Sequence, residues 1–145
     1  MEAIIFIGIQ GAGKSTFYRD HFLDTHIRIN LDMLKTRHRE QIIFQACLEA
    51  KQSLVIDNTN PTVEDRSRYI IPAKAKKIQV IAYYFQSKLE DCKKRNSQRL
   101  GKKAIPLPGI LATYKKLVAP SIEEGFDIIY SVKTNPNYSF TVEKI

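Results

Sequence analysis

The stretch AIIFIGIQGAGKST, residues 3–16, decides the fold of this chain. Its first part, Ala3–Gly8, is a continuous apolar run, which is typical of a strand buried on both faces of a sheet. Its second part, residues 8–15, fits the pattern G-x-x-x-x-G-K-[ST], and Gly13–Leu23 continues as a predicted helix. A strand, a glycine-rich turn and a helix N-terminus in this order create a nest of backbone N–H groups that binds phosphate.

The residue types in this turn indicate a site for a nucleoside triphosphate and its metal ion. The glycines let the backbone fold around phosphate oxygens, Lys14 is placed to reach the β- and γ-phosphates, and Ser15 offers a hydroxyl oxygen to Mg²⁺. Thr16 is expected to pack or to cap rather than to bind the metal. The alternative is a glycine-rich turn without a ligand. The motif predicts ATP and Mg²⁺ as cofactors, with the nucleotide bound by Gly11, Ala12, Gly13, Lys14, Ser15 and Thr16.

Short apolar runs alternate with amphipathic stretches along the rest of the chain, which favours an α/β fold with a parallel sheet covered on both faces. Ligands of such a sheet bind outside the carboxyl ends of its strands. We expect a five-stranded, mainly parallel sheet from Ala3–Gly8, Ile27–Ile29, Leu54–Ile56, Ile78–Phe85 and Phe126–Val132, with Ser139–Ile145 as a candidate for an additional edge strand. We expect helices at Gly13–Leu23, Leu34–Lys51, from Asn60-Pro61 to about Ala75, from a capping box at Ser87–Glu90 to about Gln98, and at Ile110–Val118.

Two loops that follow predicted strands carry carboxylates. Asp32 follows the second strand, where it would face the γ-phosphate and accept the proton of an attacking hydroxyl. Asn and Asp also cap helices well, so a cap for the next helix is an equal alternative for Asn30 and Asp32. Asp57 ends the third strand, where a carboxylate supports Mg²⁺ or its waters. Ser15 and Asp57 are therefore the predicted metal site, and Asn60 is expected to cap the following helix.

A cluster of basic residues follows the fourth predicted strand. Six of the eleven residues 93–103 are Lys or Arg. Arg95 and Arg99 are four residues apart and would share one face of a helix. A lid over the site, about residues 95–108, would bring these arginines to the phosphoryl group and stabilise charge in the transition state. Cations also favour helix C-termini, so a solvated helix end is an equal alternative.

The composition is that of one ordinary domain. The chain has 145 residues, of which 43% are hydrophobic and 26% are charged. Lys and Arg number 23 and Asp and Glu 15, and the net charge of +8 favours an anionic partner, with an uncommitted basic surface as the alternative. No apolar run approaches the ~20 residues of a membrane span. Cys47 and Cys92 form no CxxC motif and the N-terminus lacks the positive region of a signal peptide, so we expect a cytoplasmic protein that contacts no membrane.

In this order and spacing, the motifs resemble the kinase domain of polynucleotide 5′-hydroxyl kinases, within the superfamily of phosphate-loop (P-loop) kinases. The resemblance implies a three-layer P-loop kinase fold with a small basic lid, and a single kinase domain over residues 1–145. It extends from Ile4 to about Val132 and is carried by GAGKST at 11–16, NLD at 30–32, DNTNP at 57–61, KRNSQR at 94–99, KAIP at 103–106 and EGF at 124–126.

The resemblance also implies roles for individual residues. Asp32 matches the general base that activates the acceptor hydroxyl. Arg99 matches the lid arginine that contacts the ATP phosphates, and Arg95 matches a second lid arginine nearby. Asn58 lies in a loop that matches the family, and we count it with Lys35 and Asp32 as acceptor-binding.

Two positions depart from the family. The family often has arginine where this chain has Leu31, and one relative has arginine where this chain has Lys35. Lysine keeps the charge but loses bidentate binding of phosphate. These departures concern the acceptor side of the site, not the phosphate-binding turn.

Together these features predict an ATP-dependent kinase that phosphorylates the 5′-hydroxyl end of DNA or RNA, with no obligate protein partner. One alternative is a kinase of a small-molecule hydroxyl, such as a nucleoside, sugar or antibiotic. Another is a nucleotide-binding module that contacts RNA without phosphoryl transfer, against which Asp32 and Arg99 argue. By fold analogy, the adenine is expected near Lys133–Asn137.

Overall fold

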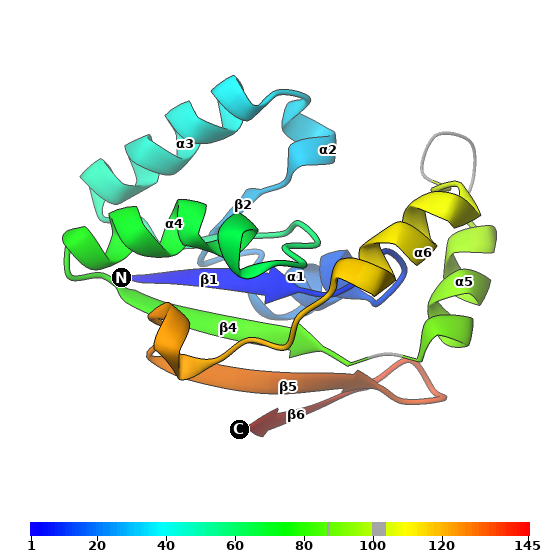
Figure 1. The fold of residues 1–145 in the computed structure, drawn as a ribbon. Coiled ribbons are helices and arrows are strands. Elements are labelled where there is room, and N and C mark those ends of the chain that lie inside the picture. The colour runs from blue at the N-terminus through cyan, green and yellow to red at the C-terminus, as the bar shows by residue number, and fades with distance from the viewer. Residues whose placement is uncertain (87, 100–103) are drawn as a thin grey trace.

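The computed structural model describes residues 1–86, 88–99 and 104–145 (Figure 1). Six strands in this part of the chain form one sheet, in the order β2-β3-β1-β4-β5-β6. Neighbours among β1 to β5 pair in parallel, and β6 pairs antiparallel with β5. The strands are β1 Glu2–Ile7, β2 Ile27–Ile29, β3 Leu54–Ile56, β4 Gln79–Phe85, β5 Ile128–Thr134 and β6 Phe140–Lys144. The predicted α/β fold with a mainly parallel sheet is confirmed. The sheet has six strands rather than the expected five, because the candidate edge strand forms as β6.

Strand β1 lies in the middle of the sheet, and its side chains belong to the hydrophobic clusters on both faces. Its side chains alternate between the two faces, as the period of two of a strand requires. Ile5 and Ile7 join one buried cluster, whereas Ile4 and Phe6 join the other. This is why the run is apolar at every position rather than at every second one.

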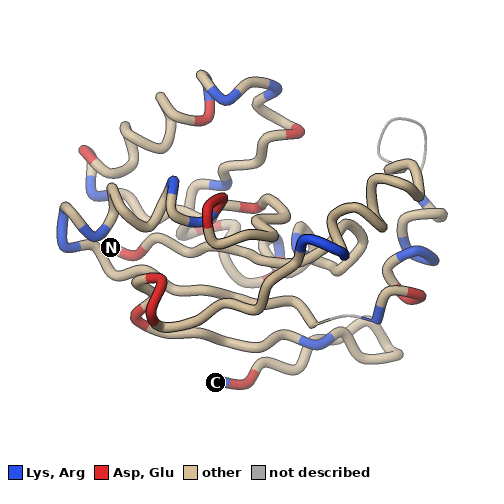
Figure 2. The backbone as a smooth tube through the Cα atoms, in the orientation of Figure 1, with Lys and Arg blue, Asp and Glu red and all other residues tan. Residues whose placement is uncertain are grey.

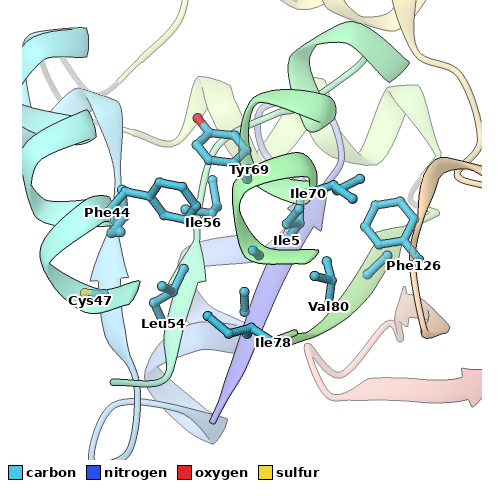
Figure 3. Close-up of a cluster of buried hydrophobic side chains, with 14 of the residues drawn as sticks. Ile5, Phe44, Cys47, Leu54, Ile56, Tyr69, Ile70, Ile78, Val80 and Phe126 are labelled. Carbon is cyan, nitrogen blue, oxygen red and sulfur yellow. The ribbon is translucent and has the colours of Figure 1, made fainter. Parts of the chain in front are cut away.

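Helices cover both faces of the sheet. On one face, α3 and α4 pack through Phe44 and Tyr69 against strand residues such as Ile5 (Figure 3). On the other face, α1 packs through Phe17, and Cys92 joins the same cluster from α5. The predicted three-layer arrangement is therefore present. The helices are α1 Lys14–His21, α2 Leu31–Leu34, α3 Arg37–Ala50, α4 Val63–Ala75, α5 Leu89–Ser97, α6 Leu107–Lys116 and the 3₁₀ turn η2 Ile122–Glu124.

Several predicted helix starts are wrong. The helix expected over Leu34–Lys51 begins at Arg37 as α3, because Lys35 has a φ of 75° and separates it from the short α2, to which Leu34 belongs. Helix α6 begins three residues before the expected Ile110. Helix α4 is capped by Thr62 in a capping box with Asp65, not by Asn60. Asn60 has another role, since its Nδ2 donates to Phe6 O at 2.8 Å and is buried there.

The start of α5 also differs from its expectation. Ser87 of the expected capping box lies outside the described residues. The N-cap position belongs to Lys88, which makes no side-chain capping hydrogen bond. Figure 1 shows α5 and α6 beyond the carboxyl ends of β1 and β4, where the phosphate-binding turn also lies.

Both cysteines are buried. Cys47 packs in the cluster under α3, and Cys92 in the cluster on the opposite face. Within the described parts of the chain, no helix has the length and apolar character needed to cross a membrane.

A buried arginine joins α4 to the segment that follows α6. Arg66 is fully buried and donates to Asn60 O at 2.9 Å, to Glu124 Oε2 at 2.9 Å and to Val118 O. We expect Arg66→Met to lower the free energy of unfolding by about 3–5 kcal/mol, because it leaves the Glu124 carboxylate buried without its partner. Urea denaturation measures the change.

The matched control for this prediction is Lys74→Met, which removes an exposed ion pair with Asp127. That variant is expected to lose no more than about 1 kcal/mol. Equal losses for the two variants would contradict the role given to Arg66.

Candidate active site

The phosphate-binding turn connects β1 to α1 and owes its shape to two glycines. Gly11 has a φ of 80° and Gly13 a φ of 95°, the left-handed region that favours glycine. A Cβ atom on Gly11 would lie 2.4 Å from the backbone oxygen of Cys92, so a side chain has no room there. Gly13 is the N-cap of α1. The N-terminus of α1 therefore opens onto the turn, as the motif predicts.

Lys14 lies in the centre of this turn. Its Nζ donates to Gly8 O and to Ile9 O, both at 2.8 Å, and the residue is 9% exposed. Burial lowers the pKa of Lys14 to about 8, against the opposing effect of the Asp57 carboxylate. The ammonium group is thus held by two carbonyls of the turn, and incoming phosphate oxygens would take their place.

Three residues from distant elements hold the turn from outside. Arg95 of α5 donates from Nη1 to Gly11 O at 2.9 Å, and Thr134 at the end of β5 donates to Ala12 O at 3.3 Å. The ring of Phe140 lies 3.1 Å from where a Cβ atom on Gly13 would be. The structure therefore places Arg95 on the backbone of the turn. It also brings the first residues of 133–137, the expected adenine region, beside the turn.

The two predicted metal ligands are in contact. Ser15 Oγ donates to Asp57 Oδ2 at 3.0 Å, and Asp57 is only 2% exposed. Mg²⁺ prefers oxygen ligands and is usually bound by one or two protein oxygens together with substrate phosphates. No group of three or more His, Cys, Asp or Glu is placed to hold a metal ion in the described residues. The donor set therefore fits a cation that binds together with phosphate.

Sequence reasoning missed Arg28, which contacts both of these residues. Its Nε donates to Asp57 Oδ2 at 2.8 Å and its Nη2 to Ser15 Oγ at 3.0 Å. The signal was present in the sequence, because an arginine stands between Ile27 and Ile29 in a strand that is otherwise apolar. Its contacts, however, follow from the pairing of β2 with β3, which the sequence does not give.

Asp32 lies in the first turn of α2, and its neighbours fix the position of that turn. Asn30, not Asp32, is the N-cap residue, since Asn30 Oδ1 accepts from Met33 N at 2.9 Å. Asn30 Nδ2 also donates to Asp57 O at 2.6 Å. Asp32 is exposed, and it lines the same cavity as Lys14. Asp32 and the phosphate-binding turn therefore line one common cavity.

Asn58 ties α2 to a buried polar network. Its Oδ1 accepts from Leu31 N at 2.9 Å, and its Nδ2 donates to Glu40 Oε2 at 3.0 Å. The Tyr69 hydroxyl donates to Glu40 Oε1 at 2.9 Å, and burial together with the Glu40 carboxylate raises the pKa of Tyr69. Both ends of the Asn58 amide are therefore engaged within the protein. Glu40, which sequence reasoning also missed, lies on the same buried face of α3 as Phe44.

We expect Asn58→Ala to lower the free energy of unfolding by about 1–3 kcal/mol, because it leaves Glu40 Oε2 and the N–H of Leu31 without their partners. Thermal or urea denaturation measures this loss. The control is Gln41→Ala on the exposed face of α3, expected to stay within about 0.5 kcal/mol of wild type. A stability of Asn58→Ala equal to that of the control would show that the network does not anchor α2.

Two cavities meet at the phosphate-binding turn. The first, of about 390 Å³, extends from the turn toward Asn60 and Lys116. The second, of about 1060 Å³, runs along the outer side of α1 and α2. Ser15, Asp32 and Arg99 line both cavities. The second cavity is also lined by Thr16, Arg19, Leu23, Met33 and the predicted acceptor-binding residue Lys35.

The predicted lid segment, 95–108, begins in α5 and ends in α6. Lys102 and Lys103 lie outside the described residues. Asn96 closes the base of the segment, because its Nδ2 donates to Ile105 O at 2.6 Å and its Oδ1 accepts from Ile105 N at 2.9 Å. Arg99, two residues after α5, is exposed at the wall shared by the two cavities.

Comparisons with known proteins agree with this geometry. A family model described as an AAA domain matches residues 4–116. A bifunctional polynucleotide phosphatase/kinase of Schizosaccharomyces pombe is 30% identical over 138 residues, and a putative bifunctional polynucleotide phosphatase/kinase of Acanthamoeba polyphaga mimivirus is 33% identical over 138 residues. Each alignment covers 90% of this chain and 33% of the relative, so the chain spans about a third of the length of these curated relatives.

A solved structure shows the same fold. A gluconokinase from Sinorhizobium meliloti matches with a TM-score of 0.62 at 15% identity, over 91% of this chain and 82% of that chain. The family model covers most of the chain, including the phosphate-binding turn, Asp32 and Arg99. The chain therefore belongs to the AAA domain family of this model, and it has the fold of the P-loop kinases.

Proposed function

We propose that this protein is an ATP-dependent kinase that transfers the γ-phosphate to the 5′-hydroxyl end of DNA or RNA. The observation that carries the proposal is the position of Asp32 in the wall common to the two cavities, opposite the phosphate-binding turn. A carboxylate there can contact an acceptor hydroxyl on one side and the nucleotide on the other. Residues 1–145 act as one kinase domain in this proposal, with 95–108 as its lid.

The residues divide the reaction between them. Asp32 accepts the proton of the acceptor hydroxyl while the hydroxyl oxygen bonds to the γ-phosphorus. The bond between the γ-phosphorus and the β–γ bridging oxygen breaks, which releases ADP. Lys14 and the N–H groups of 11–16 bind the phosphates, and Arg99 stabilises charge on the phosphoryl group in transit. Ser15 and Asp57 would hold Mg²⁺, which neutralises phosphate charge when bound.

The two arginines and the asparagine of the predicted site divide into two roles in this proposal. Arg99 is the catalytic arginine, because it lines both cavities. Arg95 positions the phosphate-binding turn through its bond to Gly11 O. Asn58 positions Asp32 through Leu31 rather than contacting the acceptor itself.

A polynucleotide acceptor is supported by three observations. The two curated relatives are named polynucleotide phosphatase/kinases. The second cavity combines basic side chains, Arg19 and Lys35, with the exposed apolar side chains of Leu23 and Met33, which suits phosphates and bases. Figure 2 shows Lys and Arg on α5, at the end of α6 and near the start of α3, as well as at the end of α4. The net charge of +8 fits an enzyme with a polyanionic substrate. We place this enzyme in the cytoplasm.

The test is transfer of γ-labelled phosphate from ATP and Mg²⁺ to a short single-stranded oligonucleotide. One arm has a 5′-hydroxyl, and the matched arm has a 5′-phosphate. We expect labelling of the first arm alone, for DNA, RNA or both. Bound ATP without transfer to any oligonucleotide would overturn the proposal and point to a small-molecule hydroxyl as acceptor.

The affinity for the acceptor should depend on salt if the acceptor is a polynucleotide. We expect the logarithm of the binding constant to fall with the logarithm of salt concentration with a slope between about −2 and −3, as three or four phosphate contacts to a single strand give. Fluorescence anisotropy of a labelled 5′-hydroxyl oligonucleotide between low and moderate salt measures it. A slope near zero would contradict a phosphate-contacting acceptor groove.

A further inference from the structure

Arg28 satisfies the same two oxygens that the metal ion would use. Its guanidinium donates to Asp57 Oδ2 and to Ser15 Oγ, while Ser15 Oγ itself donates to Asp57 Oδ2. We propose that Arg28 is a built-in cation of the nucleotide-free protein, which a divalent cation must displace to bind at this site. The proposal rests on the proposed role of Ser15 and Asp57 as metal ligands, and it adds a residue that sets the affinity for the metal.

The first step of the argument is the need of Asp57 for a counter-charge. The Asp57 side chain is 2% exposed, and a buried carboxylate is costly unless it is paired and hydrogen-bonded. Lys14 is near enough to interact with Asp57 electrostatically, but its Nζ donates to Gly8 O and Ile9 O. Arg28 Nε, in contrast, donates to the carboxylate directly. A side chain therefore supplies the positive charge at Asp57.

The second step is competition for the oxygens. A cation bound to Asp57 Oδ2 and Ser15 Oγ would compete with the guanidinium for lone pairs of these oxygens, and the two positive groups would repel each other at this distance. Arg28 must therefore move as the cation binds.

The third step is the space available for this movement. The Arg28 side chain is 27% exposed and forms part of the wall of the second cavity. Strand β2, which carries Arg28, lies at one edge of the sheet. A rotation of the side chain therefore transfers the guanidinium into that cavity without breaking the core. The cost of this exchange lowers the affinity of the nucleotide-free protein for divalent cations.

The test measures Mn²⁺ binding to the nucleotide-free protein, with free Mn²⁺ quantified by electron paramagnetic resonance. We expect Arg28→Gln to bind Mn²⁺ roughly five- to tenfold more tightly than wild type. The matched control is Arg19→Gln, which removes the same charge from the same cavity but from a residue that contacts Thr16 rather than Asp57. Arg19→Gln is expected to change the affinity by less than about twofold.

Two further variants keep the test decisive. Asp57→Asn removes the carboxylate and is expected to abolish binding. Arg28→Lys keeps the charge but replaces the fork of two N–H contacts with one ammonium group, so it is expected to fall between wild type and Arg28→Gln. It serves as the measurement if Arg28→Gln does not fold, as judged by circular dichroism.

The results that would overturn the proposal are equally specific. They are an affinity of Arg28→Gln equal to or weaker than that of Arg19→Gln, or the absence of Mn²⁺ binding to wild type and variants alike. Neither ATP nor an acceptor takes part in this measurement. Its failure is therefore distinct from a failure of the proposed kinase activity, which the oligonucleotide assay tests alone.

Discussion

The variant Asp32→Asn is expected to transfer phosphate about 10²- to 10⁴-fold more slowly than wild type, with unchanged affinity for ADP. Asparagine keeps the size of the side chain and can still accept a hydrogen bond, but it cannot take up the proton of the acceptor hydroxyl. The N-cap of α2 is unaffected, because it belongs to Asn30. Single-turnover transfer from γ-labelled ATP measures the rate, and calorimetry measures the affinity for ADP.

The control for Asp32→Asn is Asp24→Asn. Asp24 is an exposed residue in the turn after α1 that lines neither cavity, so its replacement makes the same change in net charge outside the proposed site. We expect this variant to retain the wild-type rate. A rate of Asp32→Asn within about threefold of the control would remove the general-base role from Asp32.

The second large effect is expected for Arg99→Ala, which should lower the transfer rate by about 10³- to 10⁵-fold. Arg99 lies at the wall shared by the cavities. In the proposed reaction, negative charge spreads there over the phosphoryl oxygens during transfer. Because Arg99 is exposed, its removal should change the free energy of unfolding by no more than about 0.5 kcal/mol. The measurements are the single-turnover rate and a urea titration on the same protein.

Two comparisons define this result. Arg68→Ala removes an exposed arginine of α4 that lines neither cavity, and it should leave the rate unchanged. Arg99→Lys keeps the charge but not the planar fork of the guanidinium, so it should recover only part of the lost rate. Full activity of Arg99→Ala would indicate that the basic segment around Arg99 is a solvated helix end and not a lid that acts on the phosphoryl group.

The fold was predictable where the sequence pattern is local. The apolar run of β1, the glycine-rich turn and α1 follow one another within residues 3–21, and each has its own periodicity or composition. The helix boundaries were less predictable, because they depend on distant partners. Asn60 has the sequence signal of a cap, but its side chain is taken by Phe6 O of β1, and Thr62 caps α4 instead.

The candidate site divides in the same way. Lys14, Ser15 and Asp57 follow from position alone, since each comes directly after a strand or within a motif. The contacts of Arg28 depend on the register of β2 and β3, which places Arg28 opposite Val55. Strand β3 is the neighbour of β1, which leads into the turn. The engagement of Asn58 required Glu40, which is 18 residues away in the chain and reaches it only through the packing of α3 onto the sheet. A single sequence carries no signal for such pairs.

The sharing of one wall by the two cavities has a stereochemical consequence. In the proposed reaction, donor and acceptor occupy separate openings and meet across Asp32, so both are bound before any bond is broken. The phosphoryl group then passes once, directly from one oxygen to the other, without resting on a side chain of the protein. A single in-line displacement of this kind inverts the configuration at phosphorus. A γ-phosphate made chiral with oxygen isotopes would therefore have the opposite configuration in the product.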